Sequence, residues 1–180
     1  MSEWSKTPPF NQYHPALSLH IRRGIINLER VDGLIFAYEG IKHKITRLDP
    51  IDILRAAAIF LHAGLEDTLR SIATMMLPLA GREVLNQIPL GDSRQPEKFL
   101  LGALTPFRGK SIDEVLKDRV WHHYQQVSFS SVCDIAALLA KLEIDFSEFD
   151  RFFVTIEEMI ERRHRIVHRA DLEHADLPAV

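Results

Sequence analysis

The sequence has little cysteine and no long apolar run. Its 180 residues include one cysteine, Cys133, which excludes a disulfide framework within the chain and fits a reducing compartment. Cys133 lies in an apolar helical pattern, so we expect it to be buried. No uninterrupted apolar stretch reaches the roughly 18–20 residues of a membrane span, and the opening residues MSEWSK lack the apolar region of a signal peptide. These absences predict a cytoplasmic protein with no membrane partner.

A strong excess of charge of one sign is also missing. The formal net charge is −3 with neutral histidines, which argues against a protein that coats nucleic acid with its whole surface. Any phosphate-bearing partner must therefore be bound by a local group of basic residues. Apolar residues make up 46% of the chain and charged residues 26%, close to the average for soluble globular proteins. The length is about that of one domain.

Apolar residues recur at helical spacing over most of the chain, and no convincing alternating strand is present. Residues 1–14 are expected to be an irregular N-terminal segment, and residues 15–180 a single all-α domain, a bundle of about five or six helices with a long connection at 79–110. Start and stop signals predict helices over about 15–44, from the Asp49–Pro50 start to Pro78, near 80–87 and 95–104, from the Ser111–Glu114 capping box to about Val127, from Ser131 to about Glu143, and from Ser147 to His168 or Ala170.

The last predicted helix carries a basic pair. Arg163 falls inside its broad apolar face, where a charged side chain needs a partner, a cleft or a second chain. His168 lies five residues on, about 140° around a regular helix from Arg163. The two side chains converge only if the helix kinks or ends nearby, or if a second subunit brings them together. The apolar face comprises Phe149, Phe152, Phe153, Ile156, Met159, Ile160, Ile166 and Val167.

Ordinary structural roles and a metal site compete with a functional role for these residues. Arg163 can snorkel from the edge of the core, and His168 can cap a helix C-terminus. His164 and His168, with His174 farther on, have a spacing that can hold zinc, but the neighbouring Arg165 disfavours a cation.

Other residues that could take part in chemistry have ordinary structural interpretations as well. His62 and Glu66, one turn apart, read as a solvated pair at a helix edge, with Glu66 a candidate support for Arg163. His122 and His123 read as ordinary amphipathic packing.

Residues 163–168, RHRIVH, resemble the R-x4-6-H motif of the HEPN superfamily, all-α domains that include many RNA-cleaving members. His164 occupies a motif position that is commonly Asn, Asp or His. Residues 52–66, DILRAAAIFLHAGLE, resemble the first long core helix of the RiboL-PSP-HEPN subgroup. The resemblance covers about residues 50–172 and leaves residues 1–48 and 79–110 unmatched.

The resemblance implies a metal-independent endoribonuclease without a cofactor. His168 would be the general base on a ribose 2′-hydroxyl, and Arg163 would stabilise charge on the phosphate. His164 and Glu66 would support them. The implied partners are RNA and a second copy of the chain, which together form a composite site. A role as a stress or defence toxin with an antitoxin protein stays open. The alternatives are a non-catalytic HEPN-like module that binds RNA or nucleotide or holds a dimer, and a helical scaffold in which the motif is structural.

Overall fold

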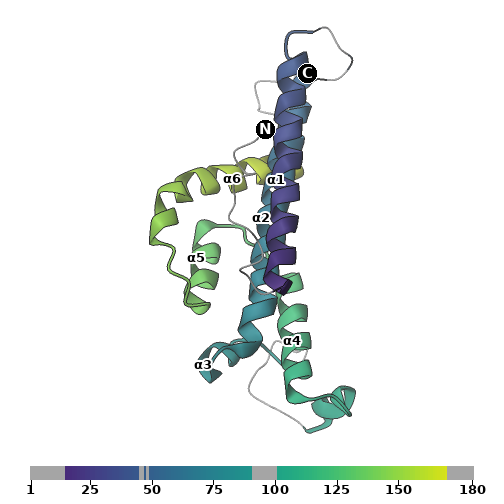
Figure 1. The fold of residues 1–180 in the computed structure, drawn as a ribbon, viewed down its shortest axis with the longest axis vertical. Coiled ribbons are helices and arrows are strands. Elements are labelled where there is room, and N and C mark those ends of the chain that lie inside the picture. The colour runs from purple at the N-terminus through teal and green to yellow at the C-terminus, as the bar shows by residue number, and fades with distance from the viewer. Residues whose placement is uncertain (1–14, 45–46, 48, 91–100, 170–180) are drawn as a thin grey trace, which may run out of the picture. The chain divides into compact units, whose positions relative to one another are not determined.

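The protein is all-α in the part that the structure describes. The computed structural model describes residues 15–44, 47, 49–90 and 101–169, and within these ranges it contains helices and no strand (Figure 1). The predicted all-α class is therefore confirmed, with six α-helices and three 3-10 segments in these residues. The predicted irregular segment at 1–14 lies outside them. No helix in the described ranges is both long and apolar enough to cross a membrane.

The described chain forms two compact units. The first contains α1, α2 as far as Thr68, the segment 130–132 and the residues from Ser147 onward; the second contains 69–129 and 133–146. The helix α2 thus contributes to both. The expectation of a single domain over residues 15–180 stays a prediction.

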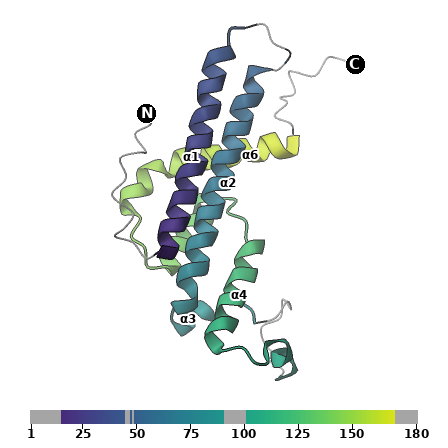
Figure 2. The same ribbon diagram turned by 45° about the vertical axis from the view of Figure 1, so that its right-hand side comes forward.

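The first unit is built on two long antiparallel helices, α1 (Pro15–Ile41) and α2 (Pro50–Met76), which lie side by side in both views (Figures 1 and 2). The predicted start of α2 is confirmed, because the Asp49 carboxylate accepts a hydrogen bond from the Ile51 amide at 2.9 Å. Such a bond satisfies one of the backbone donors that a helix start leaves unpaired.

Glycine lets the two long helices approach closely. A Cβ atom added at Gly64 of α2 would lie 3.2 Å from the Asn27 Cβ atom of α1. A short distance along the pair, Arg23 donates to Asp67 at 2.9 Å. The contact between the helices is therefore tight at its centre and tied by a polar bond at its edge.

The last helix of the first unit begins later than predicted. Residues Ser147–Phe152 form the 3-10 segment η5, and α6 spans Phe153–Arg169. The capping signal at Ser147 thus opens a tighter 3-10 turn, a common prelude to an α-helix. Both views show α6 running across the α1–α2 pair, and in Figure 2 its C-terminal end extends beyond α2. Ile160 of α6 is buried, as are Val31 and Ala57 of the long helices.

The second unit contains the C-terminal end of α2 and the shorter helices. These are η3 (Leu77–Leu79), α3 (Arg82–Leu85), η4 (Leu101–Phe107), α4 (Ile112–Gln126) and α5 (Val132–Lys141). Its largest fully buried side chains are Phe129, Leu77 and Val120. The predicted connection at 79–110 carries two short helical segments where it is described, close to the expected positions.

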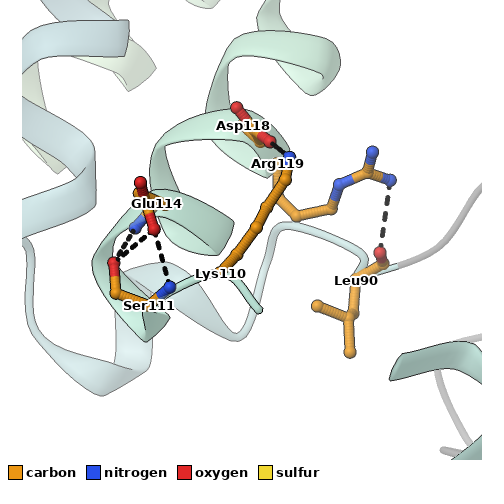
Figure 3. A network of polar contacts seen from close by, with 6 residues as sticks. All are labelled: Leu90, Lys110, Ser111, Glu114, Asp118 and Arg119. Atoms are coloured by element: carbon orange, nitrogen blue, oxygen red, sulfur yellow. Dashed lines mark hydrogen bonds and ion pairs between the residues drawn. The ribbon is translucent and has the colours of Figure 1, made fainter. Parts of the chain in front are cut away.

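The predicted capping box opens α4. The Ser111 hydroxyl oxygen accepts from the Glu114 amide at 3.2 Å, and the Glu114 carboxylate accepts from the Ser111 amide at 2.7 Å and from its hydroxyl at 2.9 Å (Figure 3). These bonds, the one from the amide first, lower the pKa of the Glu114 carboxyl. Next to the box, Lys110 pairs with Asp118, and this bond lowers the pKa of the Asp118 carboxyl.

An arginine ties the middle of α4 to the preceding connection. Arg119 donates to the carbonyl oxygen of Leu90 at 3.3 Å (Figure 3). Its guanidinium lies 5.1 Å from the centre of the Phe107 ring, within the range of a cation–π contact. Both contacts lie within the second unit and hold η4 and the segment before it against α4.

Two predictions about burial are wrong. Cys133 is exposed rather than buried, because Ile135 and Leu138 define the buried face of α5 and Cys133 precedes Ile135 by about 200° of helical turn. His62 is 4% exposed and has a partner, so it is not half of a solvated pair. It lies seven residues before the buried Leu69, on the same face of α2.

Candidate functional site

The packed face of α6 positions Arg163. Ile156, Ile160 and Arg163 follow at intervals of four and three residues, the spacing of one helix face. Ile160 is buried and the other two are half-buried. Arg163 therefore extends the apolar face of α6 toward its C-terminal end, as the sequence pattern predicted.

Two histidines lie on the exposed side of the same helix end. His164 and His168 are both exposed, and their ring centres are 4.5 Å apart with the planes inclined by 45°. The contact follows from their spacing of four residues, which places side chains one above the other. Val167, beside them, is 48% exposed. The last turn of α6 thus offers two imidazoles and an apolar side chain to solvent or to a partner.

Within one chain the structure keeps Arg163 and His168 apart. The helix α6 runs without a break through both residues to Arg169. Five residues of regular helix turn the side chain by about 140°. The helix is continuous through both residues and ends at Arg169, directly after His168. A second chain is one arrangement that could place a His168 ring opposite an Arg163 guanidinium.

The supporting acidic residue comes from another helix. Glu66 lies on α2, is half-buried and has a partner. Its support of Arg163 stays a prediction. Arg162, which the motif did not single out, is half-buried and partnered as well. The sequence could have indicated the half-burial of Arg162, because it lies three residues after Met159, at the margin of the apolar face of α6.

Within the first unit, a carboxylate of α6 bonds to a backbone amide of the segment 130–132. The Glu157 carboxylate accepts a hydrogen bond from the Val132 amide at 2.7 Å. The sequence suggested a local start at Ser131 and gave no sign of this bond between distant segments. Glu157 therefore has a structural role, because its carboxylate is already bonded to Val132. The basic residues that follow it on α6 are considered for the site instead.

The alternative of a metal site concerns His164, His168 and His174. Among the described residues, no group of three or more histidine, cysteine, aspartate or glutamate side chains is arranged to hold a metal ion. The third histidine considered for such a site, His174, lies outside these residues. His164 and His168 are available as a pair, but Arg165 follows directly on the exposed side and repels a cation.

Charge along α6 changes sign before the histidines. Glu157, Glu158 and Glu161 precede Arg162, Arg163 and Arg165. Basic side chains near a helix C-terminus are favoured by the helix dipole, and together they make a local anion-attracting end on a chain of net charge −3. Exposed imidazole and guanidinium groups at one helix end have the chemistry to bind phosphate.

The chain matches no protein-family model, no curated protein and no solved structure.

Proposed function

We propose that the protein is a metal-independent endoribonuclease of the HEPN type, acting as a homodimer. The observation that carries the proposal is the position of Arg163 on the packed face of α6, directly before the exposed His164 and His168. The residues 163–168 and 52–66 that resemble the HEPN and RiboL-PSP-HEPN patterns support it.

The proposed reaction needs one base, one cation and one proton donor. The Nδ1 or Nε2 atom of His168 takes the proton of a ribose 2′-hydroxyl. The 2′-oxygen then forms a bond to the adjacent phosphorus, and the bond from phosphorus to the 5′-oxygen breaks. The 5′-oxygen takes a proton from water or from the partner subunit's His168. The products are a 2′,3′-cyclic phosphate and a 5′-hydroxyl end, and no metal or cofactor enters the balance.

Arg163 serves the same reaction through charge. Its guanidinium can donate two parallel hydrogen bonds to the non-bridging phosphate oxygens as negative charge builds on them. A half-buried site strengthens that interaction, because fewer water molecules screen it. In this scheme His164 positions the His168 ring through their contact, and Glu66 supports the arginine.

A second chain is part of the proposal because of the helix geometry. Arg163 and His168 point about 140° apart on a continuous α6. Two α6 ends related by a twofold axis allow the arginine of each chain to meet the histidine of the other. Activity as a stress or defence toxin, controlled by an antitoxin protein, is compatible with such an enzyme.

RNA cleavage in the presence of EDTA tests the proposal. The parent protein is expected to cut single-stranded RNA and leave 2′,3′-cyclic phosphate ends. His168→Ala and Arg163→Ala each lower the rate by at least about 100-fold, the usual range for loss of a general base or a charge donor. His122→Ala, which removes an exposed histidine of α4, serves as the matched control and keeps the parent rate.

Three results of this assay carry different meanings. Cleavage that stops in EDTA overturns the metal-free mechanism. RNA binding without cleavage, equal in parent and His168→Ala, favours the non-catalytic HEPN-like module instead. If the protein neither binds nor cleaves RNA, a helical scaffold is the better description.

A further inference from the structure

The outer face of α1 carries two exposed apolar side chains and a glycine at intervals of seven residues. Leu19 is 58% exposed and Ile26, seven residues later, is 41% exposed. Gly33 follows after another seven residues, and a Cβ atom added there would have nothing within 4 Å. Residues seven apart on a helix lie within about 20° of one another, so these three form one line, called here the α1 stripe.

The stripe has the periodicity of a helix seam and no cover from the described part of the chain. Apolar residues repeated every seven positions favour a contact with another helix. Glycine is less favourable than alanine in the interior of a helix. No described residue lies close enough to Gly33 to require so small a side chain. A neighbour that fills the space above Gly33 would account for both features.

The charges beside the stripe indicate which neighbour fits. Arg22 and Glu29 flank it on one side; both are exposed, and neither forms an ion pair with any described residue. They lie seven residues apart and carry opposite signs. A second α1 running in the opposite direction would present the same two charges in reverse order.

We propose that two copies of the chain pair antiparallel through the α1 stripe, with Ile26 on the twofold axis. Each Leu19 then lies against the partner's Gly33, and each Arg22 lies beside the partner's Glu29. A parallel pairing would place Leu19 on Leu19 and leave a gap between two glycines. The antiparallel arrangement therefore satisfies both the shape and the charge of the stripe. A twofold interface uses the same surface patch of both copies, as the α1 stripe would.

The charges on the opposite side of the stripe are consistent with this pairing. There Arg23 would approach the partner's Arg30, which alone is unfavourable. Arg23 is already bonded to Asp67 at 2.9 Å, and Arg30 donates to the Asn27 side chain at 3.4 Å. The Asp67 carboxylate lies on that side and offsets the repulsion between the two arginines.

This contact is distinct from the proposed composite site. It uses α1, whereas the proposed reaction uses Arg163 and His168 of α6. Self-association through α1 and cleavage of RNA are therefore measured separately, and either can fail without the other.

A charge swap on the full-length protein tests the pairing. Sedimentation equilibrium measures self-association of the parent, Arg22→Glu, Glu29→Arg and the double swap. Each single change is expected to weaken association about tenfold, because two attractive pairs become two repulsive pairs. The double swap restores the parent affinity to within about threefold. Lys117→Glu on α4, an exposed position with the same charge change, has no effect.

Cross-linking gives a second, independent measurement. In a Cys133→Ser background, Ile26→Cys on the twofold axis is expected to form a disulfide-linked dimer on mild oxidation. Ile35→Cys, also exposed on α1 but on the opposite face, is the matched control and stays largely unlinked. Single charge changes that leave association unaltered, or equal cross-linking at positions 26 and 35, overturn the proposal. A parent protein that shows no self-association overturns it as well.

Discussion

The N-cap of α4 illustrates how single residues set the boundaries of this fold. Ser111 and Glu114 satisfy each other's backbone amides, and the whole arrangement lies at the protein surface. Because the bonds are local, three residues apart, the sequence predicts them without knowledge of the rest of the fold.

Removing the cap should destabilise the protein measurably. Ser111→Ala loses the oxygen that accepts from the Glu114 amide, so we expect the free energy of unfolding to fall by about 1 kcal/mol. Urea unfolding followed by circular dichroism measures it. Thr105→Ala, which removes an exposed hydroxyl of η4, is the comparison; an equal loss in both variants contradicts a capping role for Ser111.

The same cap predicts a pH dependence. The pKa of Glu114 is lowered by its bonds to Ser111, so its stabilising effect is complete above the ordinary carboxyl value of about 4.3 and is lost as the pH falls through the lower folded-state pKa. The stability advantage of the parent over Glu114→Gln should therefore shrink below about pH 4. An advantage that is constant between pH 7 and pH 3 argues against this account.

At the scale of elements, the close approach of α1 and α2 depends on which helix positions are glycine. A Cβ atom at Gly24 would lie 3.5 Å from the Thr68 hydroxyl oxygen, an ordinary contact, whereas one at Gly64 would lie 3.2 Å from the Asn27 Cβ atom. Both glycines lie in the interior of a long helix. They differ in how close the other helix lies to the place a Cβ atom would occupy.

Alanine at these two positions should have opposite effects. Gly24→Ala is expected to raise the free energy of unfolding by up to about 1 kcal/mol, because alanine favours the helix. Gly64→Ala is expected to lower it by about 1–3 kcal/mol, because the helices must move apart. Thermal and urea unfolding of the two variants give the comparison. Equal stabilisation by both would show that α1 and α2 do not meet at Gly64.

The elements that sequence predicts best are those with local signals. Asp49 and Pro50 mark the start of α2, and Ser111 marks that of α4, because both signals act within one turn. The start of α6 was misplaced because Ser147 opens a 3-10 segment first. The bond from Glu157 to Val132 connects distant segments and leaves no local trace.

At the scale of the whole molecule, burial and convergence are the properties that sequence predicts least. The exposure of Cys133 and the burial of His62 depend on which neighbours cover each helix face. The position of Arg163 on the apolar face follows from the period of α6 and was predicted. The angle of about 140° between Arg163 and His168 follows from the same period, and their meeting across two chains stays a prediction.

Mixing two inactive variants tests the composite site most directly. Arg163→Ala and His168→Ala are each expected to cleave RNA poorly. After unfolding and refolding together, half of the dimers are mixed and one of their two sites holds an intact arginine and an intact histidine, so about a quarter of the parent activity returns. A mixture no more active than its separate components would contradict a site that is shared between two chains.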